Sequence, residues 1–191
     1  MKKLGRKGFT LIELLAVITI MGILMLVAIP AVSRTIENSR RDTFADVAKN
    51  YINTVRNAVL ADELKCGTSD TSVGATANGK YFYKINTKSG TEAAQQTEDI
   101  MESGGLSSWS NADVEGYVEW EKKGDGERTK TTYKILLVDA GAHGIDTSTL
   151  DTSITRSSVK TSTTVIANDT TKKVTYPVTT GDNAYTECKL K

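Results

Sequence analysis

The sequence predicts an α+β protein in which one long N-terminal helix packs against an antiparallel β-sheet head. The first half of this helix suits a membrane, and its second half is amphipathic. Three observations lead to this prediction. An unbroken apolar run continues into a helical apolar pattern, apolar and polar residues alternate in the second half of the chain, and turn-forming residues separate the alternating segments.

The first predicted element is a helix long enough to cross a membrane. Apart from Thr19 and Gly22, the residues from Leu14 to Val32 are apolar or proline. With residues 9–12 added, the run covers the roughly 30 Å of bilayer hydrocarbon. The basic residues that precede it favour a single pass with the N-terminus inside the cell. They are Lys2, Lys3, Arg6 and Lys7.

Glu13 stands near the start of this apolar segment. A charged side chain at the centre of a membrane helix costs about 2.5–3.5 kcal/mol on insertion scales, so a carboxylate in such a segment is a functional candidate. The alternative is that Glu13 reaches the lipid headgroups from its place near the helix end.

Residues 7–14, with the sequence Lys-Gly-Phe-Thr-Leu-Ile-Glu-Leu, resemble the leader and cleavage signature of type IV pilins and of the related pseudopilins. Gly22 and Pro30 also lie where such subunits commonly carry these residues. The resemblance covers the leader, the apolar segment and, more loosely, the helix that follows. The rest of the chain resembles these proteins only in architecture.

The resemblance implies that a prepilin peptidase cleaves between Gly8 and Phe9 and N-methylates the new amino terminus on Phe9. It also implies that Glu13 pairs with the terminal amine of a neighbouring subunit during assembly. The segment from Gly22 to Pro30 is expected to melt when packed in a filament. A static bend is the alternative, because a proline inside a helix removes one backbone hydrogen bond.

The resemblance divides the chain into a leader peptide over residues 1–8, a transmembrane and filament-core helix over 9–32, and a globular head over 33–191. An ordinary secretory signal peptide is the main alternative for the N-terminal segment. It would release a soluble binding domain that begins near Val32. Glu13 within the apolar segment, the length of that segment, and the helical pattern that continues beyond it all count against this alternative.

The second half of the helix is predicted to continue to Lys65, with Gly67 as a left-handed stop. Its apolar residues recur at intervals of mostly three and four, which predicts one face covered by a sheet. The expected members of this face are Ile36, Phe44, Val47, Ala48, Tyr51, Val55, Ala58 and Val59.

The sheet is predicted from alternating segments in the rest of the chain. Residues 117–122 and 132–138 form an expected hairpin around the turn at 123–127. Further strands are expected at 81–85, 158–167 and 173–178, and Pro177 indicates that the last is an edge strand or a strand end. Residues 92–102 are expected to form a short helix that ends at Gly104 and Gly105.

The two cysteines are predicted to form a disulfide between Cys66, near the end of the helix, and Cys188, near the C-terminus. The region between residues 145 and 181 is rich in Ser and Thr, so the core is thin and an exported head would gain from a covalent link. Closing so long a loop would stabilise the head by about 5 kcal/mol in the chain-entropy model. Two free buried thiols are the alternative.

The chain carries no residue pattern that predicts an enzyme, a cofactor or a metal site. His143 is the only histidine, and no phosphate-binding glycine loop is present. Asp139, Asp146 and Asp151 fit no calcium loop and are expected to lie in a turn-rich connection. Removal of the four basic leader residues lowers the net charge from +1 to −3, so no nucleic-acid partner is indicated.

The resemblance implies that the chain is a structural subunit of a type IV pilus, with the partners and location of such a subunit. The expected partners are membrane lipid before assembly, further copies of the chain and other pilins in the filament, the prepilin peptidase and N-methyltransferase, an assembly ATPase and an inner-membrane platform protein. The expected location is the cytoplasmic membrane and then the cell surface. The alternative within the family is a pseudopilin or minor pilin of a type II secretion or DNA-uptake apparatus.

Overall fold

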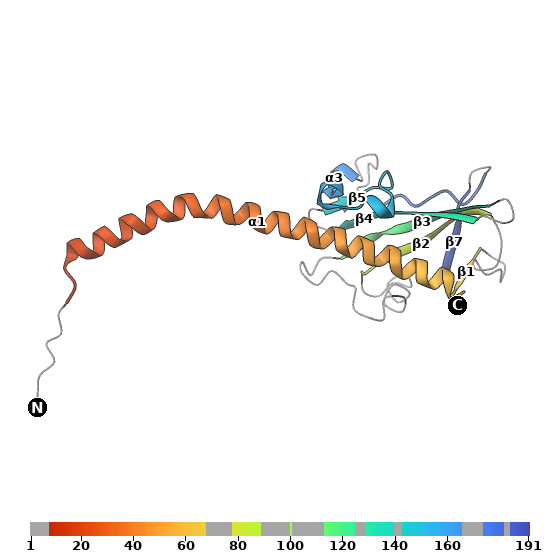
Figure 1. The fold of residues 1–191 in the computed structure, drawn as a ribbon, viewed down its shortest axis with the longest axis horizontal. Helices are drawn as coiled ribbons and strands as arrows, with labels where there is room; N and C mark the ends of the chain where they lie inside the picture. Colours follow the sequence, from red (N-terminus) through yellow and green to blue (C-terminus); the bar gives the residue numbers. More distant parts are fainter. Residues whose placement is uncertain are drawn as a thin grey trace, which may run out of the picture. The chain divides into compact units, whose positions relative to one another are not determined.

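The computed structural model describes residues 8–67, 78–88, 100, 113–124, 129–139, 143–165, 174–181 and 184–191. The chain forms two compact units, residues 1–39 and residues 40–191. One helix, α1 (Leu11–Leu60), contributes residues to both units (Figure 1). The predicted helix over 92–102 lies outside the described residues except for Ile100.

Helix α1 ends earlier than the sequence predicts. The expected end at Lys65 is wrong, because Asp62 adopts a left-handed conformation with φ of 61°. The amide of Glu63 then donates a hydrogen bond to the carbonyl of Ala58 at 3.0 Å, which is the backbone pattern of a Schellman stop. Gly67 does have a positive φ, of 79°, but it follows the first strand rather than the helix.

The second unit contains a seven-stranded sheet in the order β1-β7-β2-β3-β4-β5-β6. All neighbouring strands are antiparallel except β2 and β7, which are parallel. The strands are β1 (Leu64–Cys66), β2 (Gly79–Asn86), β3 (Val114–Gly124), β4 (Thr129–Asp139), β5 (His143–Ile145), β6 (Lys160–Thr161) and β7 (Thr186–Leu190). The predicted α+β class with a helix on a largely antiparallel sheet is therefore confirmed.

The predicted strands at 81–85, 117–122 and 132–138 are confirmed as parts of β2, β3 and β4. The prediction for 158–167 is wrong over most of the described residues. Among the described residues there, only β6 is a strand, and it lies between the 3₁₀-helix η2 (Arg156–Ser158) and the short helix α3 (Ser162–Val165). Residues 174–178 form no strand either, since they pack side chains onto the outer face of the sheet. The structure adds β1, β5 and β7, which were not predicted.

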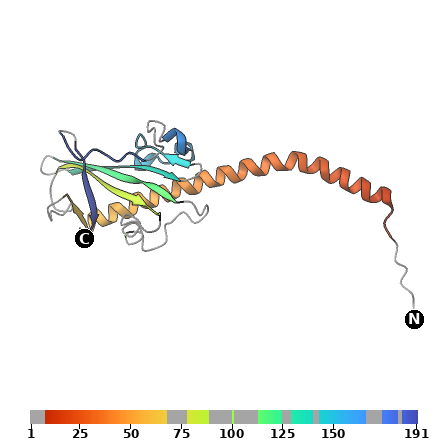
Figure 2. The same ribbon diagram turned by 180° about the vertical axis from the view of Figure 1, so that it is seen from behind.

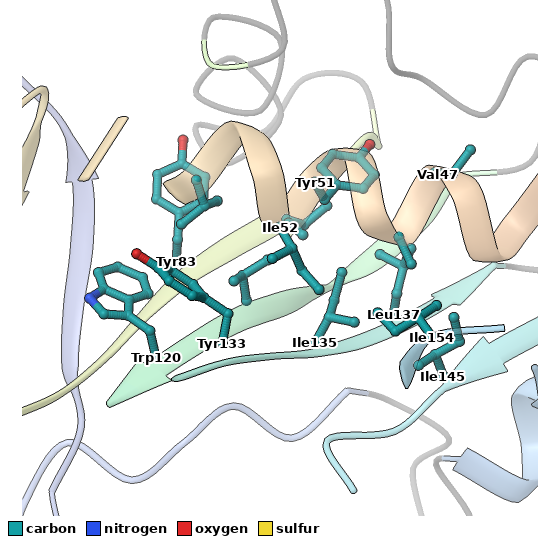
Figure 3. Close-up of a cluster of buried hydrophobic side chains, with 14 of the residues drawn as sticks. Val47, Tyr51, Ile52, Tyr83, Trp120, Tyr133, Ile135, Leu137, Ile145 and Ile154 are labelled. Carbon is teal, nitrogen blue, oxygen red and sulfur yellow. The ribbon is translucent and has the colours of Figure 1, made fainter. Parts of the chain in front are cut away.

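The main core lies between the second part of α1 and one face of the sheet. Figure 3 shows Val47, Tyr51 and Ile52 of α1 facing side chains that include Trp120 and Ile135 of the strands. Seven of the eight residues predicted to form the apolar helix face are buried, and the exception is Ile36, which is 49% exposed. Ala45 and Ile52 are also buried and were not predicted.

A second, smaller apolar cluster covers the opposite face of the sheet. It contains Phe82 of β2, Tyr117 of β3, Val138 of β4 and Val174. Because successive side chains of a strand point to opposite faces, these residues lie away from α1. Residues 174–181 and 184–185, which we call the C-terminal strap, contribute Val174, Tyr176 and Tyr185 to this cluster before the chain enters β7 (Figure 2).

Two ion pairs of opposite polarity fasten the loop over 150–158 to α1. Arg56 of α1 pairs with Asp151, at the start of the 3₁₀-helix η1 (Asp151–Ser153). Arg156 pairs with Asp42 of α1, with Nε 2.8 Å from Oδ1. The Arg56 guanidinium also lies 4.9 Å from the ring centroid of Tyr133. These contacts fix the loop at two places along the helix.

Candidate functional site

The proposed processing site lies just before α1. Gly8 is exposed, and a Cβ atom added to it would meet no other atom within 4 Å. The side chain of Phe9 is 91% exposed. Both residues of the proposed cleavage site are therefore exposed in the part of the chain that the structure describes.

Thr10 and Glu13 form a capping box at the start of α1. The amide and the hydroxyl of Thr10 both donate hydrogen bonds to Oε2 of Glu13, each at 2.8 Å. The amide of Glu13 donates back to Oγ1 of Thr10 at 3.3 Å. This reciprocal arrangement satisfies backbone donors that the first turn of a helix leaves unpaired.

The sequence analysis assigned no role to Thr10. The signal was present, because Thr-x-x-Glu immediately before an apolar run is the pattern of a capping box. In the structure the carboxylate and the amide of Glu13 both bond to Thr10 of the same chain. Its carboxylate is therefore held at the helix start by a hydrogen-bond network that lies within one turn.

The segment around Glu13 is largely apolar and exposed. Every residue from 8 to 36 is exposed. Gly22 and Pro30 both lie inside α1, which runs through them as one helix. By length and composition this part of α1 could cross a membrane.

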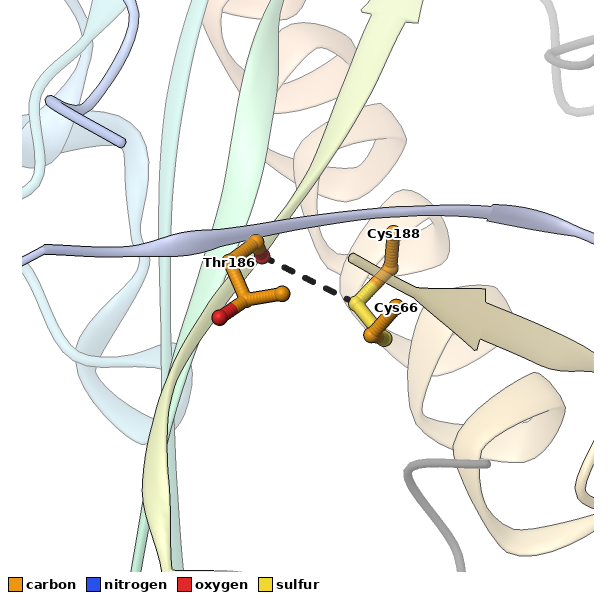
Figure 4. Close-up of a disulfide and its surroundings, with 3 residues drawn as sticks. All are labelled: Cys66, Thr186 and Cys188. Carbon is orange, nitrogen blue, oxygen red and sulfur yellow. Dashed lines mark hydrogen bonds between the residues drawn. A yellow bond between two sulfur atoms is a disulfide. The ribbon is translucent and has the colours of Figure 1, made fainter. Parts of the chain in front are cut away.

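The cysteines lie in the second unit and form the predicted disulfide (Figure 4). Cys66 of β1 is directly opposite Cys188 of β7, with the two Cα atoms 4.0 Å apart. Gly67 donates to the carbonyl of Glu187 at 2.9 Å, so the cysteines occupy the neighbouring non-hydrogen-bonded position, where paired residues come closest. Both cysteines are buried, and no described cysteine is free.

The three aspartates considered for calcium do not converge. Asp139 accepts bonds from the amide and Nδ1 of His143, at 2.8 and 3.0 Å. Asp146 bonds to Ser148 and Lys160, and Asp151 bonds to Arg56. Among the described residues, no group of three or more potential ligand side chains could hold a metal ion.

Comparison with known proteins identifies the chain's relatives. Residues 3–29 match the family described as the prokaryotic N-terminal methylation motif. A fimbrial protein of Neisseria meningitidis serogroup A / serotype 4A is 31% identical over 160 residues, which cover 74% of this chain and 89% of that protein. No solved structure matches the chain.

The leader motif and the relative agree with the fold. The motif covers the proposed processing site and most of the exposed apolar helix, while the relative extends the similarity across most of the chain. The chain therefore belongs to the type IV pilin family and is a pilin-type structural subunit.

Proposed function

We propose that this chain is a subunit of a type IV pilus that polymerises through the first part of α1. The observation that carries the proposal is that residues 8–36 are all exposed although most are apolar. An exposed apolar surface of this extent requires lipid or another protein to cover it. Lipid can cover it before assembly, and the same segments of neighbouring copies can cover it in the filament.

In this proposal the leader over residues 1–8 is removed, and Phe9 becomes the methylated amino terminus. Residues 9–32 form the membrane anchor and then the filament core, and residues 33–191 form the head. The N-terminus begins on the cytoplasmic side, and the head is displayed at the cell surface for adhesion or motility. The peptidase, an assembly ATPase and a platform protein are the expected partners.

Glu13 is proposed to select the incoming subunit. Its charge is costly in hydrocarbon, and the positive amine of a neighbouring Phe9 can compensate it only after docking. The Thr10 bonds use Oε2, and Oε1 has no hydrogen bond among the described residues. Glu13 could therefore keep its cap and still accept a proton donor on Oε1. Gly22 and Pro30 are proposed to allow the helix to loosen between them in the filament.

The first experiment is N-terminal sequencing with intact mass on protein recovered from its native cells. A chain that begins at methylated Phe9 supports the proposal, whereas one that begins near Val32 would indicate a soluble domain released by signal peptidase. Electron microscopy of sheared surface filaments, with antibody against the head, then tests assembly. Absence of such filaments together with a secretion or DNA-uptake defect on deletion would favour a pseudopilin instead.

A further inference from the structure

Two tyrosines of the C-terminal strap lie in equivalent surroundings on the outer face of the sheet. Nζ of Lys80 lies 5.6 Å from the ring centroid of Tyr185. Nζ of Lys84 lies 5.1 Å from the ring centroid of Tyr176. Both lysines belong to β2, and because they are four residues apart they point to the same face. Each distance is within the range of a cation–π contact.

Each tyrosine also lies near a glutamate of β3. The hydroxyl of Tyr176 donates to Oε1 of Glu115 at 3.1 Å, and Tyr185 lies close enough to Glu119 that burial and this carboxylate together raise the pKa of Tyr185. The sheet register repeats this construction. Glu119 is opposite residue 82 of β2, and Glu115 is opposite residue 86, so each glutamate faces the position two beyond its lysine.

We call the pair Lys80 and Glu119 the first tyrosine socket, and the pair Lys84 and Glu115 the second. Tyr185, which occupies the first socket, directly precedes Thr186, the first residue of β7. Inside β7, Glu187 pairs with Lys84 of the second socket at 2.9 Å. The chain therefore contacts β2 both at Tyr185, just before β7, and at Glu187, within β7.

These contacts bear on the register of β7. Thr186 is opposite Tyr81, and Cys188 is opposite Tyr83. A slip of one residue would turn Cys188 to the outer face of the sheet. A slip of two residues would keep its face but would move it by about 6.6 Å along the strand, which is too far from Cys66 for a disulfide. Either slip would take Tyr185 out of the first socket.

We propose that the two tyrosine sockets direct oxidative folding. They hold the strap, and with it the strand β7 that follows, in the register that places Cys188 opposite Cys66. Docking of the strap comes first, and the covalent bond follows. One cysteine thiolate attacks a small disulfide oxidant and releases one thiol. The second thiolate then attacks the mixed disulfide, which forms the Cys66–Cys188 bond and releases a second thiol. The oxidant gains two electrons, and the cysteine protons are taken up by the released thiolates.

The first test compares rates of disulfide closure in two double variants. The full chain in detergent micelles is reduced, transferred to a mixture of oxidised and reduced glutathione, and quenched at intervals by alkylation for mass measurement. Lys80→Met/Lys84→Met keeps an unbranched side chain of nearly the same length at both positions but removes both cations. We expect closure to slow by about tenfold, because the variant removes two cation–π contacts and the ion pair between Lys84 and Glu187.

The control is Lys123→Met/Lys130→Met, which removes two cations that face each other on β3 and β4. We expect this control to close at the wild-type rate. Equal rates for the two double variants would overturn the proposal.

A second test asks whether the strap can dock without the disulfide. Cys66→Ser/Cys188→Ser cannot form the disulfide. Amide hydrogen exchange of residues 184–191 reports whether the end of the strap and β7 still dock onto β2. We expect protection to persist in this variant and to be lost when Lys80→Met/Lys84→Met is added. Loss of protection in the serine variant with both lysines intact would show that the disulfide positions the strap, and the proposal would be wrong. No variant in this comparison has to form the disulfide. The exchange measurement therefore tests the proposal even if the lysine variants cannot be oxidised in the first experiment.

Discussion

The two parts of α1 differ in where their apolar residues find partners. Among residues 11–39 none is buried, whereas residues 44–59 contribute nine buried side chains to the core of the head. In the first part apolar residues surround the helix, and in the second they follow one face. The difference teaches that burial within the chain stabilises the head, while the first part must obtain its burial from lipid or from other copies.

The comparison predicts that substitutions before residue 40 alter processing and assembly, and that substitutions after it alter the stability of the head. The largest effect is expected from Gly8→Arg. A long charged side chain at the proposed cleavage site should block the peptidase, so that only full-length precursor accumulates and no filaments form. Immunoblotting of cell fractions and electron microscopy measure both outcomes.

Gly8→Ala is the control for that substitution, because the added Cβ atom has free space around it. It should be cleaved to a greater extent than the arginine variant. If Gly8→Arg yielded normal mature chain, cleavage would occur elsewhere.

The second prediction contrasts two residues that the sequence places on the same apolar face. Phe44 is fully buried, whereas Ile36 is 49% exposed. Phe44→Ala should lower the free energy of unfolding of the head by about 3–5 kcal/mol, since it leaves a cavity. Ile36→Ala should change it by about 0.5 kcal/mol or less. Urea denaturation in detergent tests the pair, and equal losses would contradict the division of α1.

The third prediction concerns pH and the buried hydroxyl of Tyr51. This hydroxyl has no hydrogen-bond partner among the described residues, and burial raises the pKa of Tyr51 to about 12. An unfolded tyrosine ionises near pH 10, so stability should fall as pH rises from 10 to 12. Tyr51→Phe should remove up to about 3 kcal/mol of that loss.

At neutral pH the same substitution should be neutral or slightly stabilising, because it removes an unbonded polar group from the core. Unfolding free energies measured at pH 7 and pH 11.5 give both values. A destabilised Tyr51→Phe at pH 7 would show that the hydroxyl bonds to a group outside the described residues.

The fourth prediction separates the charge of Glu13 from its cap. Glu13→Ala should leave membrane insertion intact but lower the amount of filament by about tenfold or more, as expected for loss of one partner of a desolvated charge pair. Glu13→Gln keeps an acceptor for Thr10 and lacks the charge. If the charge matters, it should assemble as poorly as Glu13→Ala; normal filaments from Glu13→Gln would leave only the cap as the role of this residue.

The smallest effect is expected from Thr10→Val, which removes the hydroxyl from the capping box. Loss of an N-cap costs about 1 kcal/mol, so filament yield should fall by several-fold, and Thr10→Ser should restore it. The unfolding free energy of the head should stay unchanged in both variants. A destabilised head would contradict the separation between the two parts of α1.

The sequence predicted those features that depend on periodicity. The helix, its buried face and the strands β2, β3 and β4 were predicted because apolar residues recur with the period of each structure. The disulfide was predicted because the chain has a single pair of cysteines. The processing motif was predicted because the residues around Gly8 and Glu13 form a compact signature.

Features that depend on distant partners could not be predicted in this way. Asp62 ends α1, although a glycine usually occupies a left-handed stop. The sequence pattern therefore indicated Gly67, the first glycine after the helix, as the stop. Strand β7 is short, and nothing in its composition shows that it lies parallel to β2. Residues 174–178 alternate like a strand, but Tyr176 bonds to Glu115 on the sheet face rather than joining the sheet edge.

The place of β7 between β1 and β2 also decides when the head can be completed during synthesis. Ribosomes deliver a chain from its N-terminus, so β7 emerges after the other strands of this sheet, and until then β1 has no neighbour in the sheet. A premature stop codon before residue 186 would remove an interior strand rather than an edge. A reporter fused after Lys191, whose amide bonds to the carbonyl of Glu63 at 2.9 Å, would need a flexible spacer to leave that strand in place.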